Sequence, residues 1–458
     1  MTLYRQPYYK STSLEREVHH LNCSPVGENL SIHKIKQGET LVVEGPARIV
    51  LEDGELTLIG APIRQGDKPL IVKKSRQVAL EGVTDSILKI SLGVGAQVEL
   101  LDTSTIPLEW KELAETLKKH SLPFRAIFLG DVDTGKTTFV MYLGNLFCQW
   151  GMKSGILSTD IGQGFPGLIS LFQLNSPIID MAEVTPTDAF FVGATSPNCF
   201  EHRVMTGTQK MLKKAELLKI EILFIDTDGW VYGNKARELK TSLLQLIQPN
   251  VLVVVERERE LEHLVRPFLN LIDDVYRMPA SQKIRYRDRT DRKFLRESML
   301  SKQLRANSNS TTFHFKEVGF INSFLNTGEI VSKALCEKIS EILGYVPEYI
   351  ELCQDVLLIV EAIEHPLSDI VIEKLQEEFS HLIIRIIDPK TIENVLIGLL
   401  NHQNRFLGFG VVTHIDFLKQ LITIYSPVSK DKITSIQFGS IKITQNGQEI
   451  CWIRPWSF

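Results

Sequence analysis

The chain contains 458 residues, with 51 lysines and arginines against 55 aspartates and glutamates, a formal net charge of −4. At about 150 residues per domain, this length predicts two to four domains with substantial cores. The small net charge excludes nucleic-acid binding through a globally basic surface, so any such binding requires a local basic patch.

Cysteine usage and the apolar runs indicate the compartment. The six cysteines are scattered and form no Cys-x-x-Cys pair, which argues against a zinc site or a disulfide framework and fits a reducing compartment. The first residues lack the apolar core of a signal peptide, and no apolar run is long enough to span a bilayer. We therefore expect a soluble, intracellular and cytoplasmic protein that does not bind a membrane.

The N-terminal part has the pattern of a small β domain. Residues 1 to about 25 are polar without a clear period, and we expect partly irregular structure there. From about residue 28 to residue 101, short β-rich runs (40–43, 47–51 and 56–59) alternate with glycines. Short strands with turns about every eight to twelve residues are typical of a sandwich or barrel. We expect an all-β domain over residues 1–104, followed by a helix within residues 104–120.

Residues 130–138, Gly-Asp-Val-Asp-Thr-Gly-Lys-Thr-Thr, match the phosphate-binding pattern Gly-x-x-x-x-Gly-Lys-Ser/Thr. An apolar run at 124–129 predicts a strand before this loop, and helical spacing predicts a helix over 138–150 after it; this context separates a P-loop from a chance match. The glycines let backbone N–H groups turn toward a phosphate at the positive end of the helix. Lys136 then reaches the β- and γ-phosphates, and Thr137 is placed for Mg²⁺.

Three further apolar runs, at 155–160, 221–226 and 251–255, alternate with helical segments. This pattern predicts an α/β fold whose mostly parallel sheet is covered on both faces. Ligands bind such sheets at the carboxyl ends of the strands. Asp160 and Asp226 end two of the predicted strands, so we expect both to converge on the P-loop within a domain spanning residues 105–345.

Residues 283–305 carry nine lysines and arginines against three acidic residues. A solvated helix face is one interpretation of such a run. Because the arginines would cover more than one face of any helix, a mobile basic lid over the phosphates is the other. We expect a polar loop at 306–312 and the end of the domain near 344–347.

Strand-like runs return after this point, at 356–360, 382–387, 407–412 and 420–425, with one helix over 370–379. Residues 346–458 are therefore expected to form a third domain, β-rich and of the α+β class.

The two acids narrow what the P-loop does. An acid at a strand end beside a P-loop holds the magnesium shell or accepts the proton of an attacking hydroxyl. Asp160 is better placed to activate an acceptor, because Gly162 and Gln163 follow it in a turn, whereas Asp226 has the position of the usual Walker B acid. A helix cap or loop acid is the alternative for each. The Asn-Lys-x-Asp segment of guanine-specific GTPases is missing from the sequence, which favours ATP.

Trp230 lies between Gly229 and Gly233, directly after a predicted active-site strand. Its indole either stacks on a nucleobase, which is worth about 1–3 kcal/mol per base, or packs beneath the loop.

Five segments are informative together: the P-loop, Asp-x-Gly-Gln at 160–163, residues 190–197, Thr-x-Gly-Trp at 227–230 and the basic run at 283–305. In this combination the chain resembles the polynucleotide 5′-hydroxyl kinases of the Clp1/Grc3 family, and its compact ends are similar to those of prokaryotic members. Residues 41–47 and 395–443 also resemble the outer domains of that family, so the likeness covers most of the chain.

The resemblance implies transfer of the γ-phosphoryl of ATP to the 5′-hydroxyl end of RNA or DNA, with Mg²⁺ as cofactor and the N-terminal β domain helping to hold the adenine. It implies that Asp160 is the general base, that Gln163 lies near the acceptor, and that Thr227, Gly229 and Trp230 clasp the substrate end. Metal ligands would come from Thr137, Asp160 and Asp226, and the catalytic lid arginines from Arg285, Arg287, Arg289 and Arg292. The nucleotide-binding residues would be Gly130, Asp131, Val132, Asp133, Thr134, Gly135, Lys136, Thr137 and Thr138.

One departure from the family pattern is visible. The family often has Asp-x-Asp-x-Gly-Gln, and Ser158 stands in place of the first aspartate. A serine can hold a magnesium-bound water, and Asp226 remains available. The competing functions are a non-catalytic ATP-binding scaffold of an RNA-processing complex and an ATPase or small-molecule kinase. A scaffold needs neither the base nor the lid, and a small acceptor needs neither the clasp nor a basic track.

Overall fold

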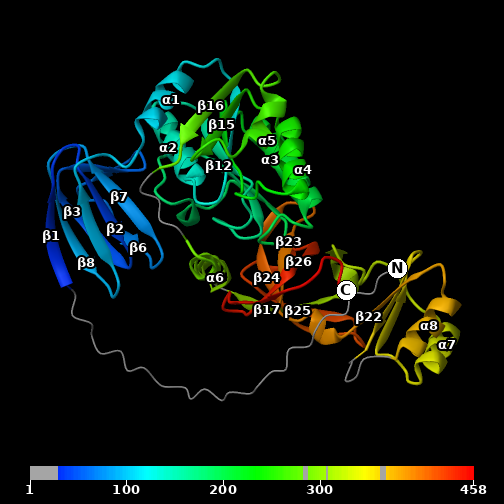
Figure 1. The fold of residues 1–458 in the computed structure, drawn as a ribbon. Helices are drawn as coiled ribbons and strands as arrows, with labels where there is room; N and C mark the ends of the chain where they lie inside the picture. The colour runs from blue at the N-terminus through cyan, green and yellow to red at the C-terminus, as the bar shows by residue number, and fades with distance from the viewer. Residues whose placement is uncertain (1–28, 282–286, 306–307, 362–367) are drawn as a thin grey trace.

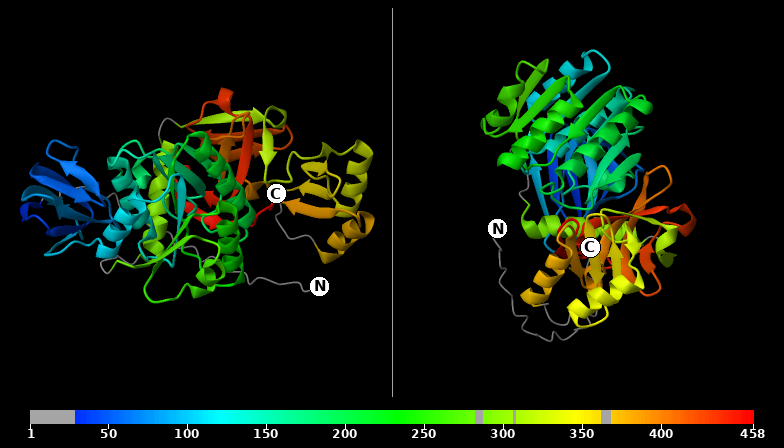
Figure 2. Two further views of the ribbon diagram at one scale, coloured as in Figure 1. Left: turned by 90° about the horizontal axis from the view of Figure 1, so that it is seen from above. Right: turned by 90° about the vertical axis from the view of Figure 1, so that its right-hand side faces the viewer.

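The computed structural model describes residues 29–281, 287–305, 308–361 and 368–458. The N-terminal stretch expected to be irregular and the lid residue Arg285 lie outside these ranges. The described chain forms a β-sandwich, a central α/β unit and a β-rich C-terminal part, which lie side by side (Figures 1 and 2). The expected fold class is confirmed. No helix in the described ranges is long and apolar enough to cross a lipid bilayer.

The N-terminal unit is a sandwich of two antiparallel sheets around a small aliphatic core. Alternating buried and exposed residues along its strands produce the two faces that this packing needs. The strands of the first sheet are β1 (Asn29–Ile35), β8 (Ser86–Leu92), β3 (Ala47–Asp53) and β6 (Leu70–Val72), and those of the second are β5 (Ala61–Arg64), β4 (Glu55–Leu58), β7 (Gln77–Gly82), β2 (Thr40–Glu44) and β9 (Gln97–Leu101).

The central unit is a seven-stranded sheet. Five neighbouring strands are parallel, and two antiparallel strands extend one edge. The parallel strands are almost wholly apolar because both of their faces are covered. In sheet order the strands are β13 (Asp188–Phe191), β12 (Leu168–Gln173), β11 (Ser154–Ser158), β14 (Ile222–Asp226), β10 (Phe124–Gly130), β15 (Val251–Glu256) and β16 (Asp274–Pro279).

Helices cover both faces of this sheet and separate two cores. One core contains Phe124 and Phe128 of β10 with the helices α1 (Leu108–Lys118) and α2 (Lys136–Gln149). The opposite core contains Ile127 and Leu129 of the same strand with α3 (Glu201–Leu217), α4 (Asn234–Ile247) and α5 (Glu262–Val265). The predicted covering of both faces is confirmed.

The C-terminal part contains two sheets. The first consists of β17 (Asn309–His314), β25 (Leu421–Ser426), β24 (Phe406–Asp416), β23 (Val395–Leu400), β26 (Ser435–Ile443) and β18 (Gly319–Ile321), with β27 (Glu449–Trp452) paired to β26. The second consists of β19 (Glu329–Ile330), β20 (Tyr349–Leu352), β21 (Val356–Val360) and β22 (Ile383–Ile387), covered by α7 (Lys333–Leu343) and α8 (Asp369–Glu378).

The strand pairing moves the expected domain boundary. Residues 309–314 were expected mainly as loop and residues up to 345 as part of the P-loop domain, but β17 pairs with β25, β18 with β26 and β19 with β20. Because these strands complete C-terminal sheets, we propose a boundary near residue 306. The error has a physical source: β17 is a polar edge strand with only Phe313 buried, so its sequence lacks the apolar alternation of a strand.

The C-terminal sheet packs directly on the central sheet. Gln437 donates from Nε2 to the carbonyl of Phe191 at 3.0 Å, and the Ser440 N–H donates to the carbonyl of Gly193 at 2.7 Å. Gly193 has a φ of +77°, and a Cβ on it would lie 2.6 Å from the Cα of Gly439. The two backbones therefore meet where neither residue has room for a side chain.

Replacing Gly439 tests this contact. An alanine Cβ there would lie 2.7 Å from the Leu396 carbonyl oxygen and 2.9 Å from that of Gly193. Since both obstacles are backbone atoms, we expect Gly439→Ala to lower the free energy of unfolding by about 1–3 kcal/mol, as overpacking does, measured by denaturant unfolding. Gly319→Ala is the control, because its new Cβ would lie 3.2 Å from the Ser435 hydroxyl and no nearer than 3.9 Å to the Thr434 carbonyl oxygen. Equal stability of the two variants would contradict the tight interface.

Candidate active site

The P-loop joins the end of β10 to the start of α2. Gly135 caps the helix with a φ of +91°, a left-handed conformation that favours glycine. Gly130 has no room for a side chain, because a Cβ would lie 2.6 Å from the Val255 carbonyl oxygen. The expected strand, loop and helix are therefore confirmed, and the loop lies at the carboxyl end of the sheet.

Lys136 folds back onto its own loop. Its Nζ donates to the Asp131 carbonyl at 2.7 Å, and the Thr134 hydroxyl donates to the same oxygen at 3.0 Å. Burial lowers the pKa of Lys136, while the nearby carboxylates of Asp226 and Asp160 act in the opposite direction. The ammonium is thus held beside the loop and close to two acids.

Asp226 is the last residue of β14 and contacts the first turn of α2. Its Oδ2 accepts a hydrogen bond of 2.8 Å from the Thr137 hydroxyl, and Ser158 is its register partner on the neighbouring strand β11. Burial, followed by the negative charge of Asp160, raises the pKa of Asp226 to about 7, against the opposing effect of Lys136. In the described part of the chain, the other oxygen, Oδ1, is buried without a hydrogen-bond partner.

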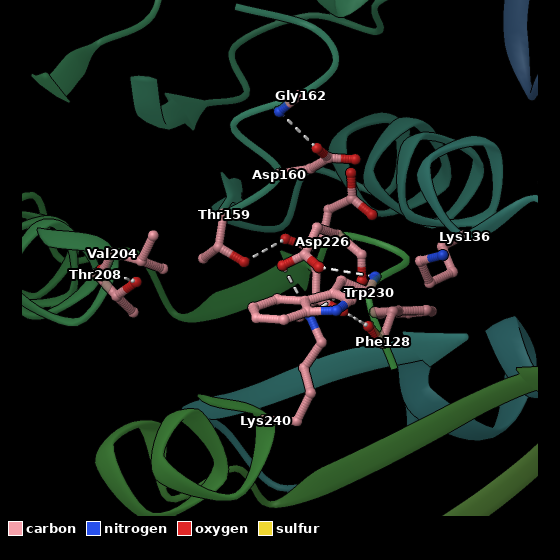
Figure 3. A network of polar contacts seen from close by, with 12 residues as sticks. Phe128, Lys136, Thr159, Asp160, Gly162, Val204, Thr208, Asp226, Trp230 and Lys240 are labelled. Atoms are coloured by element: carbon pink, nitrogen blue, oxygen red, sulfur yellow. Dashed lines mark hydrogen bonds and ion pairs between the residues drawn. The ribbon is translucent and has the colours of Figure 1, made fainter. Parts of the chain in front are cut away.

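Among the described residues, the hydrogen bonds to Asp160 all go to one carboxylate oxygen. Its Oδ1 accepts from the backbone N–H groups of Gly162 at 2.8 Å and Gln163 at 3.2 Å, and Figure 3 shows the carboxylate facing that of Asp226. Burial, followed by the charge of Asp228, raises the pKa of Asp160. The expected convergence of Asp160 and Asp226 on the P-loop is confirmed.

A cavity of about 200 Å³ joins the P-loop to the N-terminal sandwich. One end is polar and is lined by Lys136, Thr137, Asp160 and Gln163. The other end is lined by sandwich and α1 residues, namely Val42, Thr57, Leu58, Ile59, Gln77, Val78, Ala79, Glu81 and Trp110. Val132, Asp133, Gly135, Thr138 and Gly229 also line it. The cavity thus has a phosphate-binding end and a more apolar end, as a nucleotide requires.

Two of the predicted lid arginines reach the site. Arg292 forms an ion pair of 2.7 Å with the carboxylate of Asp133, to which the Arg287 backbone N–H also donates at 3.4 Å. The Arg287 side chain donates to Oε1 of Gln163 at 3.3 Å. Arg289 is exposed at the start of α6 (Arg289–Arg305) and lies apart from these contacts. Arginines therefore join the P-loop to the turn that contains Gln163.

The helix α6 is attached to the C-terminal sheet. The sequence of the basic run was also compatible with a mobile lid, and the contacts of α6 differ from that expectation. Arg296 forms a two-point ion pair with Glu449 of β27, at 2.6 and 3.0 Å. Leu300 and Leu304 are fully buried in the core that α6 shares with the C-terminal sheet, and Figure 1 shows α6 beside β24 of that sheet. Only the N-terminal end of the helix faces the P-loop.

The segment that follows β14 corrects one expected contact. Thr227 was expected to clasp the substrate, but it is fully buried, and its hydroxyl donates to the Phe128 carbonyl at 2.7 Å. It therefore fixes the loop and does not line a surface. Gly229 approaches the P-loop so closely that a Cβ would lie 2.7 Å from the backbone nitrogen of Val132. Trp230 is partly exposed.

Two functional candidates escaped the sequence analysis. Arg257, just after β15, donates to the Asp133 carbonyl at 2.8 Å. Lys240 of α4 is fully buried against Asp228. Arg257 could have been predicted from its position, because it is a cation directly after a core strand. A lysine on the apolar face of a predicted helix was the signal for Lys240.

Residues 130–304 match the family model described as the mRNA cleavage and polyadenylation factor CLP1 P-loop. A polyribonucleotide 5′-hydroxyl-kinase of Methanocaldococcus jannaschii is 27% identical over 354 residues, which cover 76% of this chain and 95% of the relative. One of Pyrococcus furiosus is 26% identical over 76% of this chain and 96% of its own. The chain therefore contains a segment that matches the Clp1 P-loop model, and over about three quarters of its length it is similar to archaeal polyribonucleotide 5′-hydroxyl-kinases.

A solved structure agrees with this assignment at the level of fold. The Clp1p chain of a Clp1p–Pcf11p complex superimposes with a TM-score of 0.64 at 12% identity, covering 91% of this chain and 98% of that chain. The three-part Clp1-type architecture therefore extends over nearly all of the protein, including the C-terminal sheets beyond the matched P-loop segment.

The role of Thr227 in this Clp1-type site is testable by stability. Thr227→Val keeps the shape but leaves the buried Phe128 carbonyl without its donor, so we expect a loss of about 1–3 kcal/mol in the free energy of unfolding. Thr227→Ser keeps the hydroxyl and should lose less. The measurement is denaturant unfolding of both variants. A Thr227→Val protein as stable as the wild type would argue against the structural role.

Proposed function

We propose that this protein is an ATP-dependent polynucleotide 5′-hydroxyl kinase that transfers the γ-phosphoryl group of ATP to the 5′-hydroxyl end of RNA or DNA. The observation that carries the proposal is the position of Asp160: a carboxylate with one oxygen engaged by the turn lies in the same cavity as Lys136 and Thr137. A protein that only bound ATP would need Lys136 and Thr137 but not Asp160. The archaeal relatives named polyribonucleotide 5′-hydroxyl-kinases support it.

The donor half of the site follows from the P-loop. Lys136 would leave the Asp131 carbonyl and bind the β- and γ-phosphate oxygens, which accept more strongly because they are charged. The adenine would occupy the end of the cavity between Trp110 and the sandwich residues Val42 and Val78. The γ-phosphate would then face Asp160.

The residues present fit a magnesium ion. Thr137 supplies a hydroxyl, and Asp226 supplies a buried oxygen that has no partner among the described residues; hard oxygen ligands of this kind suit Mg²⁺. When bound, the ion neutralises charge on the β- and γ-phosphate oxygens. The Ser158 hydroxyl lies one strand away, in register with Asp226, where it can hold a metal-bound water in place of the family's usual aspartate.

The acceptor half contains the base. The second carboxylate oxygen of Asp160 would accept the proton of the 5′-hydroxyl. The hydroxyl oxygen would form a bond to the γ-phosphorus while the bond from the γ-phosphorus to the bridging oxygen breaks and ADP leaves. Burial raises the pKa of Asp160, which strengthens it as a base while it remains ionised. Gln163, held by Arg287, and Trp230 would contact the end of the strand.

The arginines complete the charge balance. Negative charge spreads over the transferred phosphoryl group, and a positioned arginine there is worth about 10³–10⁵ in rate. Arg292 is paired with Asp133 of the P-loop itself, and Arg287 lines the cavity. Both would lie beside the γ-phosphate, whereas the exposed Arg289 would not.

Phosphoryl transfer itself is the first test. Labelled ATP, Mg²⁺ and single-stranded 5′-hydroxyl RNA and DNA oligonucleotides should give 5′-labelled strands. Lys136→Ala should lower kcat by about 10²–10³, because it removes a preorganised charge, and Asp160→Asn by about 10²–10⁴, because it removes the base. ATP binding without transfer to any oligonucleotide, and without an effect of Asp160→Asn, would favour the scaffold instead. Labelling of small hydroxyl compounds alone would favour a small-molecule kinase.

The arginines can be ranked in the same assay. Arg292→Gln and Arg287→Gln should each lower kcat by at least about tenfold, because each removes a cation from the phosphate end of the cavity. Arg289→Gln is the matched control on the same segment and should retain its rate. A larger loss for Arg289→Gln than for Arg292→Gln would contradict this assignment of the lid.

A further inference from the structure

A lysine is buried where the helix pattern calls for an apolar residue. Lys240 has no exposed surface and lies on the face of α4 that enters the core. The other buried residues of that face are Ala236, Leu239, Leu243, Leu244 and Ile247. Burying an ammonium costs several kcal/mol unless it is paired and hydrogen-bonded. Its partners therefore indicate why it is there.

Both partners belong to one residue, Asp228. The Nζ of Lys240 donates to Oδ2 of Asp228 at 2.7 Å and to its backbone carbonyl at 3.0 Å. The other carboxylate oxygen, Oδ1, accepts the backbone N–H of Trp230 at 2.8 Å. Lys240 thus holds the side chain and the backbone of Asp228, and Asp228 holds the backbone of Trp230. Figure 3 shows the lysine reaching toward this turn from below the indole.

The rest of the loop is fixed on both sides of Trp230. Before it, Thr227 is hydrogen-bonded to Phe128, and Gly229 lies against Val132 of the P-loop. After it, the buried Val231 has its carbonyl 2.8 Å from Nε2 of His263. The indole of Trp230 is then the partly exposed group that this fixed turn presents.

A buried ion pair is a poor source of stability, because replacing both partners with apolar residues is often neutral or stabilising. Its value is geometric: the pair specifies one conformation of the turn. We propose that Lys240 is a positioning residue for the acceptor strand, which acts through Asp228 to hold the Trp230 indole against the first nucleotide. This inference rests on the proposed kinase function.

The test is a comparison of Michaelis constants. Lys240→Met keeps the length of the side chain and removes the charge, so the turn loses its clamp. We expect the KM for a 5′-hydroxyl oligonucleotide to rise about tenfold, since base stacking on an aromatic ring is worth about 1–3 kcal/mol. The KM for ATP should stay within about twofold, because the hydrogen bonds of Lys240 to the described residues both go to the turn before Trp230. Arg237→Met, which removes an exposed cation from the same helix, should change neither constant.

A double-mutant cycle separates positioning from a general loss of structure. If Lys240 acts through the indole, Lys240→Met should add nothing to the oligonucleotide KM of Trp230→Ala. Additive effects, or an equal rise of both Michaelis constants, would overturn the inference.

Two further outcomes remain decisive. If Lys240→Met does not fold, the paired variant Lys240→Met with Asp228→Asn, which leaves no unpaired buried charge, replaces it in the same measurements. The paired variant should show the same selective rise, and wild-type constants for it would overturn the inference. A wild-type protein that transfers no phosphoryl group would instead refute the proposed function.

Discussion

The buried carboxylate of Asp226 is the constraint on which the site depends. It lies at the end of β14, between the P-loop strand β10 and the strand β11 that leads to Asp160. Because parallel strands end at one edge, the sheet brings two carboxylates and one lysine close together. Burial raises the pKa of both carboxylates, and the charge of Asp160 raises the pKa of Asp226 further, while Lys136 offsets part of both shifts. A bound divalent cation would supply the positive charge that this edge of the sheet lacks.

The surrounding units give this edge its shape. The sandwich docks on α2, where Asn145 donates from Nδ2 to the Ile59 carbonyl at 2.8 Å, and so closes the far end of the cavity. The C-terminal sheet makes two contacts with the rest of the chain. Gly439 packs against the segment that follows β13, and Glu449 forms an ion pair with Arg296 of α6. Glu183 of the central unit forms ion pairs with Lys73 of the sandwich and Lys302 of α6, at 2.5 and 2.7 Å. Glu183 therefore joins the sandwich to α6, the helix that carries Arg292.

The parts of the fold that were predictable are those with a strong local pattern. The P-loop, its flanking strand and helix, and the strands ending at Asp160 and Asp226 follow from continuous apolar runs and glycine chemistry, because a two-faced buried sheet requires them. The polar edge strand β17 was missed because its partner, β25, lies more than a hundred residues away in the chain and nothing local marks the pairing. Thr227 was misassigned because a threonine in a motif looks the same whether its hydroxyl faces a substrate or a backbone carbonyl. The anchoring of α6 depends on Glu449, which no spacing rule connects to Arg296.

The buried charges of the site lower the stability of the fold, and this loss bears on whether the site only binds ATP or also transfers a phosphoryl group. Holding ATP requires the P-loop, Lys136 and one acid for the metal. Asp160 adds a second carboxylate, whose pKa burial and the charge of Asp228 raise against the opposing effect of Lys136 and Lys240, and Asp228 adds a third that is paired with Lys240. Each addition lowers stability unless it is compensated, and none of them improves the binding of a triphosphate, which is itself anionic. The proposed phosphoryl transfer would give both residues a use, because its acceptor must lose a proton and be held in line. Ser158, which stands where the Clp1/Grc3 pattern often has an aspartate, adds no further negative charge beside Asp226.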